Sequence, residues 1–195
     1  MERQVATLVV VGLVLLAGCG TTVQETDKPT RNATMSLSGY ERTADVSPVE
    51  MRMFWDRTSN WEDPQNRSVR VSSRARTYDN VSGADTVVVY TTPEKTYAGE
   101  YRIQAMSPAD RARMATESVE FPSFGNETQR NYTASILDRE RTVRVLPGAA
   151  GTPVHVTHTA RNDAVVVVVI SGANRSTVER ALGSVSFRGG TASAG

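Results

Sequence analysis

The stretch that decides the fold is Val154-His155-Val156-Thr157-His158-Thr159-Ala160-Arg161-Asn162-Asp163-Ala164-Val165-Val166-Val167-Val168-Val169-Ile170. In its first half, apolar and polar residues alternate, which predicts a strand with one face in the core. Asn162 and Asp163 favour a tight turn that sends the chain back alongside itself. Residues 165–170 are all apolar, as expected for a central strand that is covered on both faces. The stretch therefore predicts a hairpin at the centre of an antiparallel sheet.

Further strands are predicted by the same period of two on the N-terminal side of this hairpin. The apolar positions are Val49, Met51, Met53 and Trp55 in one segment and Val69, Val71 and Ala75 in a second. The valine-rich residues 86–90, which follow a turn at residues 82–85, predict a third strand.

Two helices are also predicted. Ser107 and Pro108 are typical of an N-cap and a first helical position, which indicates a helix that ends near Ser118. Asn174 begins a second helix, whose apolar residues recur at helical spacing. We therefore expect an α+β fold, in which an antiparallel sheet carries two or so helices packed on one face.

The N-terminal residues predict export. Arg3 precedes an apolar stretch of residues 5–16, which is shorter than the ~20 residues that a membrane-spanning helix needs. The following Leu16-Ala17-Gly18-Cys19 resembles the lipobox of lipoproteins, a family in which the cysteine receives a lipid and becomes the mature N-terminus. We expect a signal peptide at residues 1–18, a flexible tether at 19–33, a single α+β domain at 34–188 and a disordered tail at 189–195.

The composition excludes several classes of protein. Cys19 is the single cysteine, so an internal disulfide framework and a cysteine-based zinc site are excluded. The net charge of +1 argues against nucleic acid as a partner. We expect no metal and no cofactor.

Six of the eight asparagines lie in Asn-x-Ser/Thr sequons, more than the serine and threonine content gives by chance. Such sequons are acceptors of N-glycans on exported proteins, although asparagine is also common in Ser/Thr-rich turns. The candidates are Asn32, Asn66, Asn80, Asn126, Asn131 and Asn174.

The segment Thr86–Pro93, followed by Gly99 and by Met106-Ser107-Pro108-Ala109-Asp110, resembles an uncharacterised family of haloarchaeal lipoproteins. Members of that family combine a lipobox with a valine-rich strand, a helix opened by Met-Ser, a valine-rich hairpin and a short C-terminal helix. The resemblance implies an archaeal, membrane-anchored cell-surface protein of unknown molecular role.

Few residues suggest chemistry. His155 and His158 are three apart on a strand, so their side chains point to opposite faces and cannot chelate one metal together unless a bulge intervenes. Ser107 is explained by its capping role rather than as a nucleophile. Trp55, Trp61 and Tyr78 either line a pocket or lie in the core.

Arginines near one strand form the best candidate site. Arg70, Arg74 and Arg76, with Arg67 nearby, share one face and could bind carboxylate, phosphate or anionic lipid headgroups. The alternative is that they pair with acidic residues of a neighbouring strand, for which Asp138 and Glu140 are candidates.

We expect a lipid-anchored, N-glycosylated protein on the extracellular face of the cell membrane. It would act as a binding or interaction module for an envelope protein, a glycan or a small molecule, and no catalytic constellation is evident. The alternative is an envelope hydrolase or transferase that uses His155 or His158 with a carboxylate.

Overall fold

The computed structural model describes residues 23–27, 31–55, 67–83, 85–93, 103–161 and 163–187. The chain divides into two compact units, one of residues 1–25 and 52–70 and the other of residues 26–51 and 71–195. The second unit holds most of the described residues, including both histidines. Cys19, Asn66, Trp61 and the expected tail at 189–195 lie outside the described residues, as do the side chains of Arg70 and Trp55.

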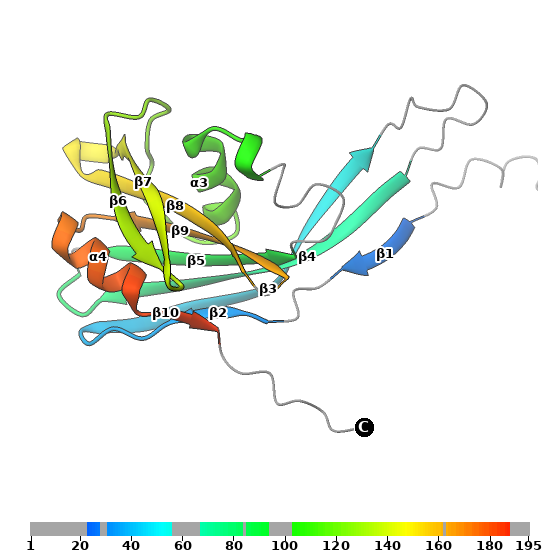
Figure 1. Ribbon diagram of the computed structural model, residues 1–195, viewed down its shortest axis with the longest axis horizontal. Helices are drawn as coiled ribbons and strands as arrows, with labels where there is room; N and C mark the ends of the chain where they lie inside the picture. The colour runs from blue at the N-terminus through cyan, green and yellow to red at the C-terminus, as the bar shows by residue number, and fades with distance from the viewer. Residues whose placement is uncertain are drawn as a thin grey trace, which may run out of the picture. The chain divides into compact units, whose positions relative to one another are not determined.

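Strands make up most of the described chain (Figure 1). They are β1 (Val23–Asp27), β2 (Ala33–Met35), β3 (Tyr40–Trp55), β4 (Arg67–Asn80), β5 (Thr86–Pro93), β6 (Arg130–Ile136), β7 (Arg139–Pro147), β8 (Pro153–Arg161), β9 (Ala164–Ser171) and β10 (Val185–Phe187). Two α-helices, α3 (Pro108–Thr116) and α4 (Arg175–Gly183), helical residues at 103–105 and a short 3₁₀ turn, η1 (Ala149–Gly151), accompany them in the described part.

The main sheet has the order β1-β4-β5-β9-β8-β7-β6 in the described residues, with β3 paired to β4, and β2 pairs separately with β10. The pairs from β4 through β9 are antiparallel. As predicted, β8 and β9 form a hairpin, with Val156 opposite Val169 and Ala160 opposite Val165. Strand β9 lies between β5 and β8, and all of its residues are buried, so the central strand is confirmed.

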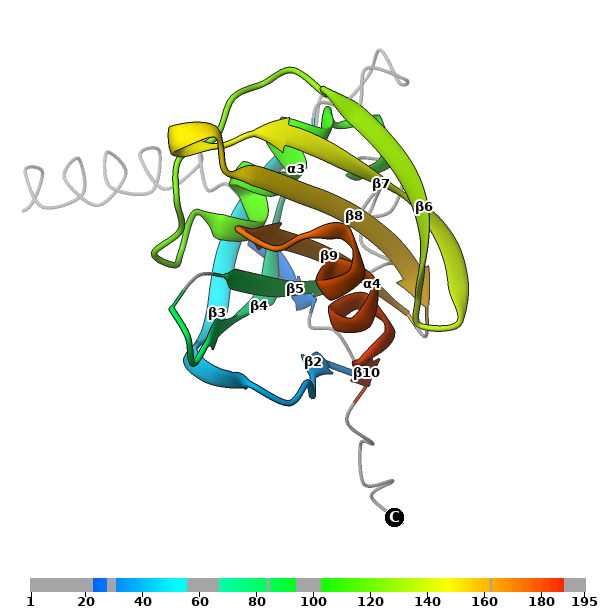
Figure 2. The same cartoon turned by 90° about the vertical axis from the view of Figure 1, so that its left-hand side faces the viewer.

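The alternating side chains of β9 supply two separate cores. Val166, Val168 and Ile170 pack with α4 residues Val178 and Leu182 on one face. On the other face, the odd-numbered valines of β9 pack with α3. Figure 2 shows α4 inside the curve made by β6 to β9.

Ala109, Ala112 and Ala115 form the buried side of α3. Because alanine side chains are short, the helix can approach the valine-rich face of β5, β8 and β9 closely. The two caps were correctly predicted: Ser107 Oγ accepts from Asp110 N–H at 3.1 Å, and Asn174 Oδ1 accepts from Thr177 N–H at 3.0 Å.

The predicted α+β class is wrong. The fold is mostly antiparallel β and resembles a β-sandwich, with only small helices. Strands β3 and β4 continue for 16 and 14 residues, well beyond the short alternating segments recognised in the sequence. The two nine-residue helices also cover opposite faces rather than one face, because an all-apolar β9 needs cover on both sides.

The expected domain bounds stay predictions, although two structural facts bear on them. Strand β1 falls within the segment expected to be a tether, and Ala33 at the end of that segment is fully buried beside β5. The folded unit therefore includes residues before position 34.

Candidate functional site

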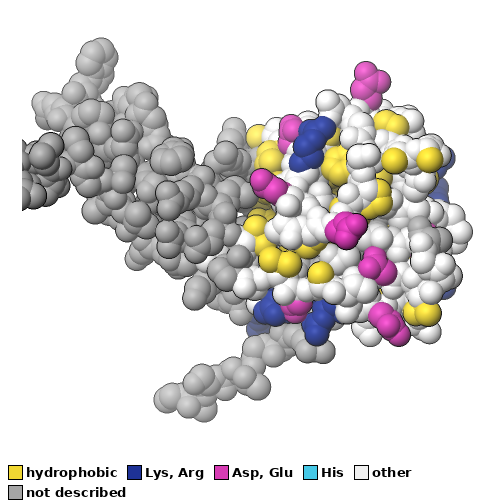
Figure 3. Space-filling view, turned by 180° about the vertical axis from the view of Figure 1, so that it is seen from behind, with side chains coloured by type: hydrophobic (Ala, Val, Ile, Leu, Met, Phe, Trp, Pro, Cys, Tyr) yellow, Lys and Arg dark blue, Asp and Glu magenta, His cyan; other side chains and the backbone are white. Residues whose placement is uncertain are grey.

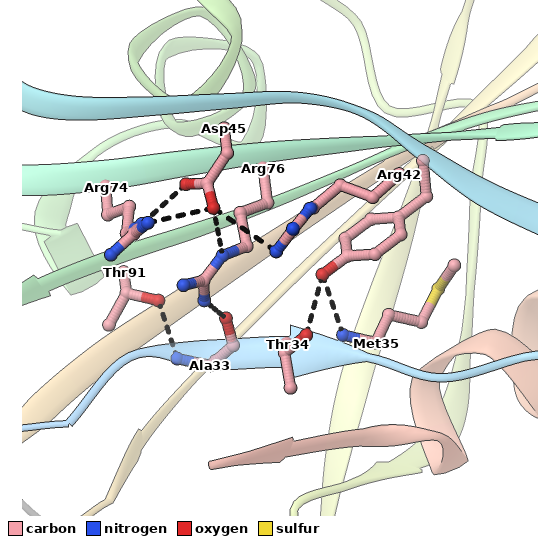
Figure 4. Close-up of polar contacts among 9 residues, drawn as sticks. Ala33, Thr34, Met35, Arg42, Asp45, Arg74, Arg76 and Thr91 are labelled. Atoms are coloured by element: carbon pink, nitrogen blue, oxygen red, sulfur yellow. Dashed lines mark hydrogen bonds and ion pairs between the residues drawn. The ribbon is translucent and has the colours of Figure 1, made fainter. Parts of the chain in front are cut away.

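Two arginines of the predicted patch, Arg74 and Arg76, lie at the contact between β3 and β4, where both bind Asp45 (Figure 4). Arg74 donates through Nε and Nη2 to the two carboxylate oxygens, the second at 2.8 Å. Arg76 donates through Nε to Asp45 Oδ2 at 3.2 Å. Arg42 adds a third guanidinium, with its Nη1 3.3 Å from the same oxygen. The single carboxylate of Asp45 thus forms ion pairs with three arginines.

Arg76 also connects the main sheet to β2. Its side chain is 7% exposed, and its Nη1 donates to the backbone oxygen of Ala33. Thr91 Oγ1 accepts from Ala33 N–H at 3.1 Å, so both backbone polar groups of Ala33 are bonded to the sheet (Figure 4). Buried backbone groups need such partners, and this contact holds β2 in place.

Tyr78 continues this connection and lies in the core. Its hydroxyl is 2.8 Å from Thr34 Oγ1 and accepts from Met35 N–H at 3.1 Å. The sequence leaves two positions open for Tyr78, the lining of a pocket and the core. The structure shows it in the core, with 4% of the residue exposed.

Burial alone would raise the pKa of the Asp45 carboxyl, but hydrogen bonds and charges from Arg74 and Arg76 outweigh it and leave that pKa below its ordinary value. The carboxylate therefore stays ionised and offsets one of the three positive charges around it. Of the predicted face, Arg74 and Arg76 do come together. Arg74 Nε and Nη2 and Arg76 Nε donate to Asp45, and Arg76 Nη1 donates to the Ala33 carbonyl. Anion binding at these residues stays a prediction.

Asp138 and Glu140 are not the partners of these arginines, so that part of the prediction is wrong. Both lie at the β6–β7 hairpin, whereas the neighbours of β4 are β1, β3 and β5. Asp138 instead pairs with Arg161 at 2.8 Å, and the Asp138 side chain is 89% exposed.

His155 is buried beneath α4. Its Nε2 lies 3.1 Å from the backbone oxygen of Ala173, so this nitrogen carries the proton and donates. Its Nδ1 then accepts from the Tyr132 hydroxyl at 3.0 Å. Burial lowers the pKa of His155 below its ordinary value, against the opposing effect of the Ala173 hydrogen bond. Both ring nitrogens are thus engaged by groups other than carboxylates.

His158 lies on the opposite face and contacts α3. Its Nδ1 is 2.8 Å from Nη1 of Arg111. Burial, helped by the charges of Arg111 and Arg141, lowers the pKa of His158 to about 4. The imidazole is therefore neutral at physiological pH, and its hydrogen-bond partner is a cation.

The predicted sequon asparagines differ in exposure. Asn126, Asn131 and Asn174 are exposed. Asn80 is half-buried, and its Oδ1 accepts from Ser82 N–H at 3.0 Å within its turn. Asn32 is half-buried, and its Oδ1 has no hydrogen-bond partner in the described residues.

Open hollows lie beside the loop that follows α3. One of about 500 Å³ is lined by Met114, Phe121 and Phe124, with Arg113 Cζ 5.9 Å from the centroid of the Phe124 ring. Another of about 510 Å³ shares Phe121 and is bordered by Asp79 and Asp85. On the face behind that of Figure 1, small hydrophobic patches are separated by polar and acidic side chains (Figure 3).

Neither of these hollows includes a histidine. Within the described ranges, no group of three or more His, Cys, Asp or Glu residues is placed to hold a metal ion. No helix in the part of the chain that the structure describes is long and apolar enough to cross a membrane.

Three residues were not recognised from the sequence: Asp45 and Arg111, described above, and Arg144 of β7, which lies on the same face of the sheet as His158. Asp45 was missed because its partners come from β4, about thirty residues away, and strand pairing is not visible in local spacing. Arg111 was missed because it lies among ordinary helix residues, and Arg144 because it is one of several arginines in β7. Thr142, Arg144 and Leu146 are two residues apart along β7, and this alternation was the available signal that the three side chains share one face of the sheet.

Comparisons with known proteins found no matching family model, no matching curated protein and no matching solved structure.

Proposed function

We propose that this protein is a lipid-anchored, N-glycosylated surface protein on the extracellular face of the membrane, and that its domain is a binding module. The sequence Leu16-Ala17-Gly18-Cys19 after an apolar stretch supports the anchor, and the six sequons support exposure outside the cell.

The hydrogen-bond partners of the two histidines are the observation that favours a binding function over a catalytic one. A general base normally needs a nearby proton donor to act on and, in the usual arrangement, a carboxylate that orients its ring. His155 is bonded to Tyr132 and the Ala173 carbonyl, and His158 to Arg111. These partners give no support to a hydrolase or transferase built on either histidine and a carboxylate.

Replacing Cys19 with serine tests the anchor. We expect the Cys19→Ser chain to leave the membrane fraction, whereas Thr21→Ser, a matched change two residues further on, should stay with it. Protease added to intact cells should digest the anchored wild-type chain. Retention of Cys19→Ser in membranes, or protection from the protease, would contradict the proposal.

Native mass spectrometry of the full chain purified from its own membranes tests the binding role. We expect a reproducible non-covalent adduct. Chromogenic ester, phosphate and glycoside substrates form the opposing test. Turnover that is lost in His155→Gln or His158→Gln but kept in Asn131→Gln would establish the enzymatic alternative instead.

A further inference from the structure

A second group of arginines lies where α3 meets β8, on the face opposite His155. Arg111 is held there by hydrogen bonds from its Nε and Nη2 to the backbone oxygen of Met106, the latter at 2.8 Å. Its Nη2 also reaches the backbone oxygen of Gln104 at 3.4 Å, and its Nη1 contacts His158. The guanidinium is therefore fixed in position, and one N–H of Nη1 is left without a hydrogen bond among the described residues.

The contact with Arg111 also fixes the tautomer of His158. A guanidinium can only donate, so His158 Nδ1 accepts and the ring proton lies on Nε2. His158 Nε2 makes no hydrogen bond in the described part of the structure and is not among its fully enclosed unpaired atoms. The ring thus offers one N–H donor next to a fixed positive charge.

Arg144 brings a second guanidinium to the same place. On β7 it pairs with Val156 of β8, so its side chain lies on the same face of the sheet as that of His158, two residues further along β8. Burial is the main cause of the lowered pKa of Arg111, and the charge of Arg144 lowers it further, which indicates that the two guanidinium groups lie near each other.

Within the described ranges, no carboxylate forms an ion pair with Arg111 or with Arg144. Arg74, Arg76 and Arg161 each have such a partner. Bringing like charges together in a partly buried place costs free energy unless an anion neutralises them.

We propose that Arg111, His158 and Arg144 form a binding site for a single phosphate or carboxylate group. The free N–H of Arg111, the Nε2–H of His158 and the fork of Arg144 would donate to its oxygens, as guanidinium groups commonly do. This inference deepens the proposed function and rests on it, since it assigns the chemistry of a ligand to the binding module.

Calorimetric titration of the full chain in a non-ionic detergent with inorganic phosphate tests the site. We expect saturable binding that weakens about tenfold or more in Arg144→Gln, because a charged donor that can form two parallel hydrogen bonds is lost. Arg139→Gln is the matched control, since it removes an exposed arginine of the same strand and should change the affinity less than about twofold. His158→Gln should weaken binding too, and the ¹⁵N signal of His158 Nε2 should shift on addition of phosphate.

Glycerol phosphate and acetate distinguish the possible sources of the anion. Tighter binding of glycerol phosphate than of inorganic phosphate would indicate a lipid-headgroup-like ligand, and preference for acetate a carboxylate. Absence of saturation by any of them at about 10 mM, or equal losses in Arg144→Gln and Arg139→Gln, would overturn the site. The proposed function would survive that result if the adduct in native mass spectrometry persisted, and would fail separately if the adduct were absent.

Discussion

Arg76 and Asp45 form an ion pair in which Arg76 Nε lies 3.2 Å from Asp45 Oδ2 and the arginine side chain is only 7% exposed. A buried arginine that loses its carboxylate remains charged, because its pKa is too high for it to lose the proton. We predict that Asp45→Asn destabilises the protein by about 2 kcal/mol, between the values for an exposed and a buried pair, because the Arg76 side chain is buried but the Asp45 side chain is 21% exposed. Denaturant unfolding of the full chain measures this change.

The matched control is Asp138→Asn. Asp138 also pairs with an arginine, but its side chain is 89% exposed, so the loss should stay below about 1 kcal/mol. Equal losses in the two variants would show that the Asp45 cluster behaves as a surface pair and does not hold β2 to the sheet.

The lowered pKa of His158 predicts that the protein loses stability on acidification. Its pKa is about 4 in the folded protein against an ordinary value of 6.5, so the unfolded chain binds more protons between these values. Stability from this group is complete above pH 6.5 and falls as the pH drops towards 4. Allowing for solvent screening, we expect a loss on the order of 2 kcal/mol, measured by unfolding at a series of pH values.

The variant His158→Gln should flatten this pH dependence. His155 adds a contribution of the same sign, since its pKa is also lowered by burial, so the slope should shrink rather than vanish. If the slope of stability against pH were unchanged in His158→Gln, His158 would be solvated, and burial beside Arg111 would not keep it neutral.

The parts of the fold that could be predicted depend on short-range signals. The six apolar residues 165–170 identified the central strand, and Ser107 and Asn174 identified the two helix starts, because a run or a cap is complete within a few residues. Short-range signals could not predict which face of the sheet each helix covers. The buried side of α3 consists of alanines, whose weak hydrophobicity does not show which face of which sheet they cover.

The candidate sites show the same limit. That Arg74 and Arg76 share a face follows from alternation within one strand, but their partner Asp45 comes from β3, and only the pairing of β3 with β4 brings it there. The cluster of Arg111, His158 and Arg144 draws on α3, β8 and β7. Each residue is ordinary in its own segment, and their chemistry appears only when the three elements meet.

The close packing of α3 on the sheet predicts a strong penalty for a larger side chain. Ala112 is fully buried on the face of α3 that contacts β5, β8 and β9. We expect Ala112→Leu to destabilise the protein by about 1–3 kcal/mol, because the added atoms force the helix away from the valines. Ala105→Leu makes the same change at an exposed position and should have little effect on the unfolding free energy. Similar values for both would indicate a loosely packed α3.

Asn174 combines two roles that substitution can separate, because it caps α4 and lies in an exposed sequon. We expect Asn174→Ala to lose about 1 kcal/mol of unfolding free energy, since the Thr177 N–H loses its acceptor. Asn174→Asp keeps an acceptor of equal capping strength but removes the glycan acceptor, so it should retain the stability of the unglycosylated wild-type chain. Glycopeptide mass spectrometry of the protein from its own cells then reports the other role, with any sugar at position 174 lost in both variants. Destabilisation by Asn174→Asp as large as that by Asn174→Ala would show that the amide itself, and not the acceptor oxygen, is needed at this position.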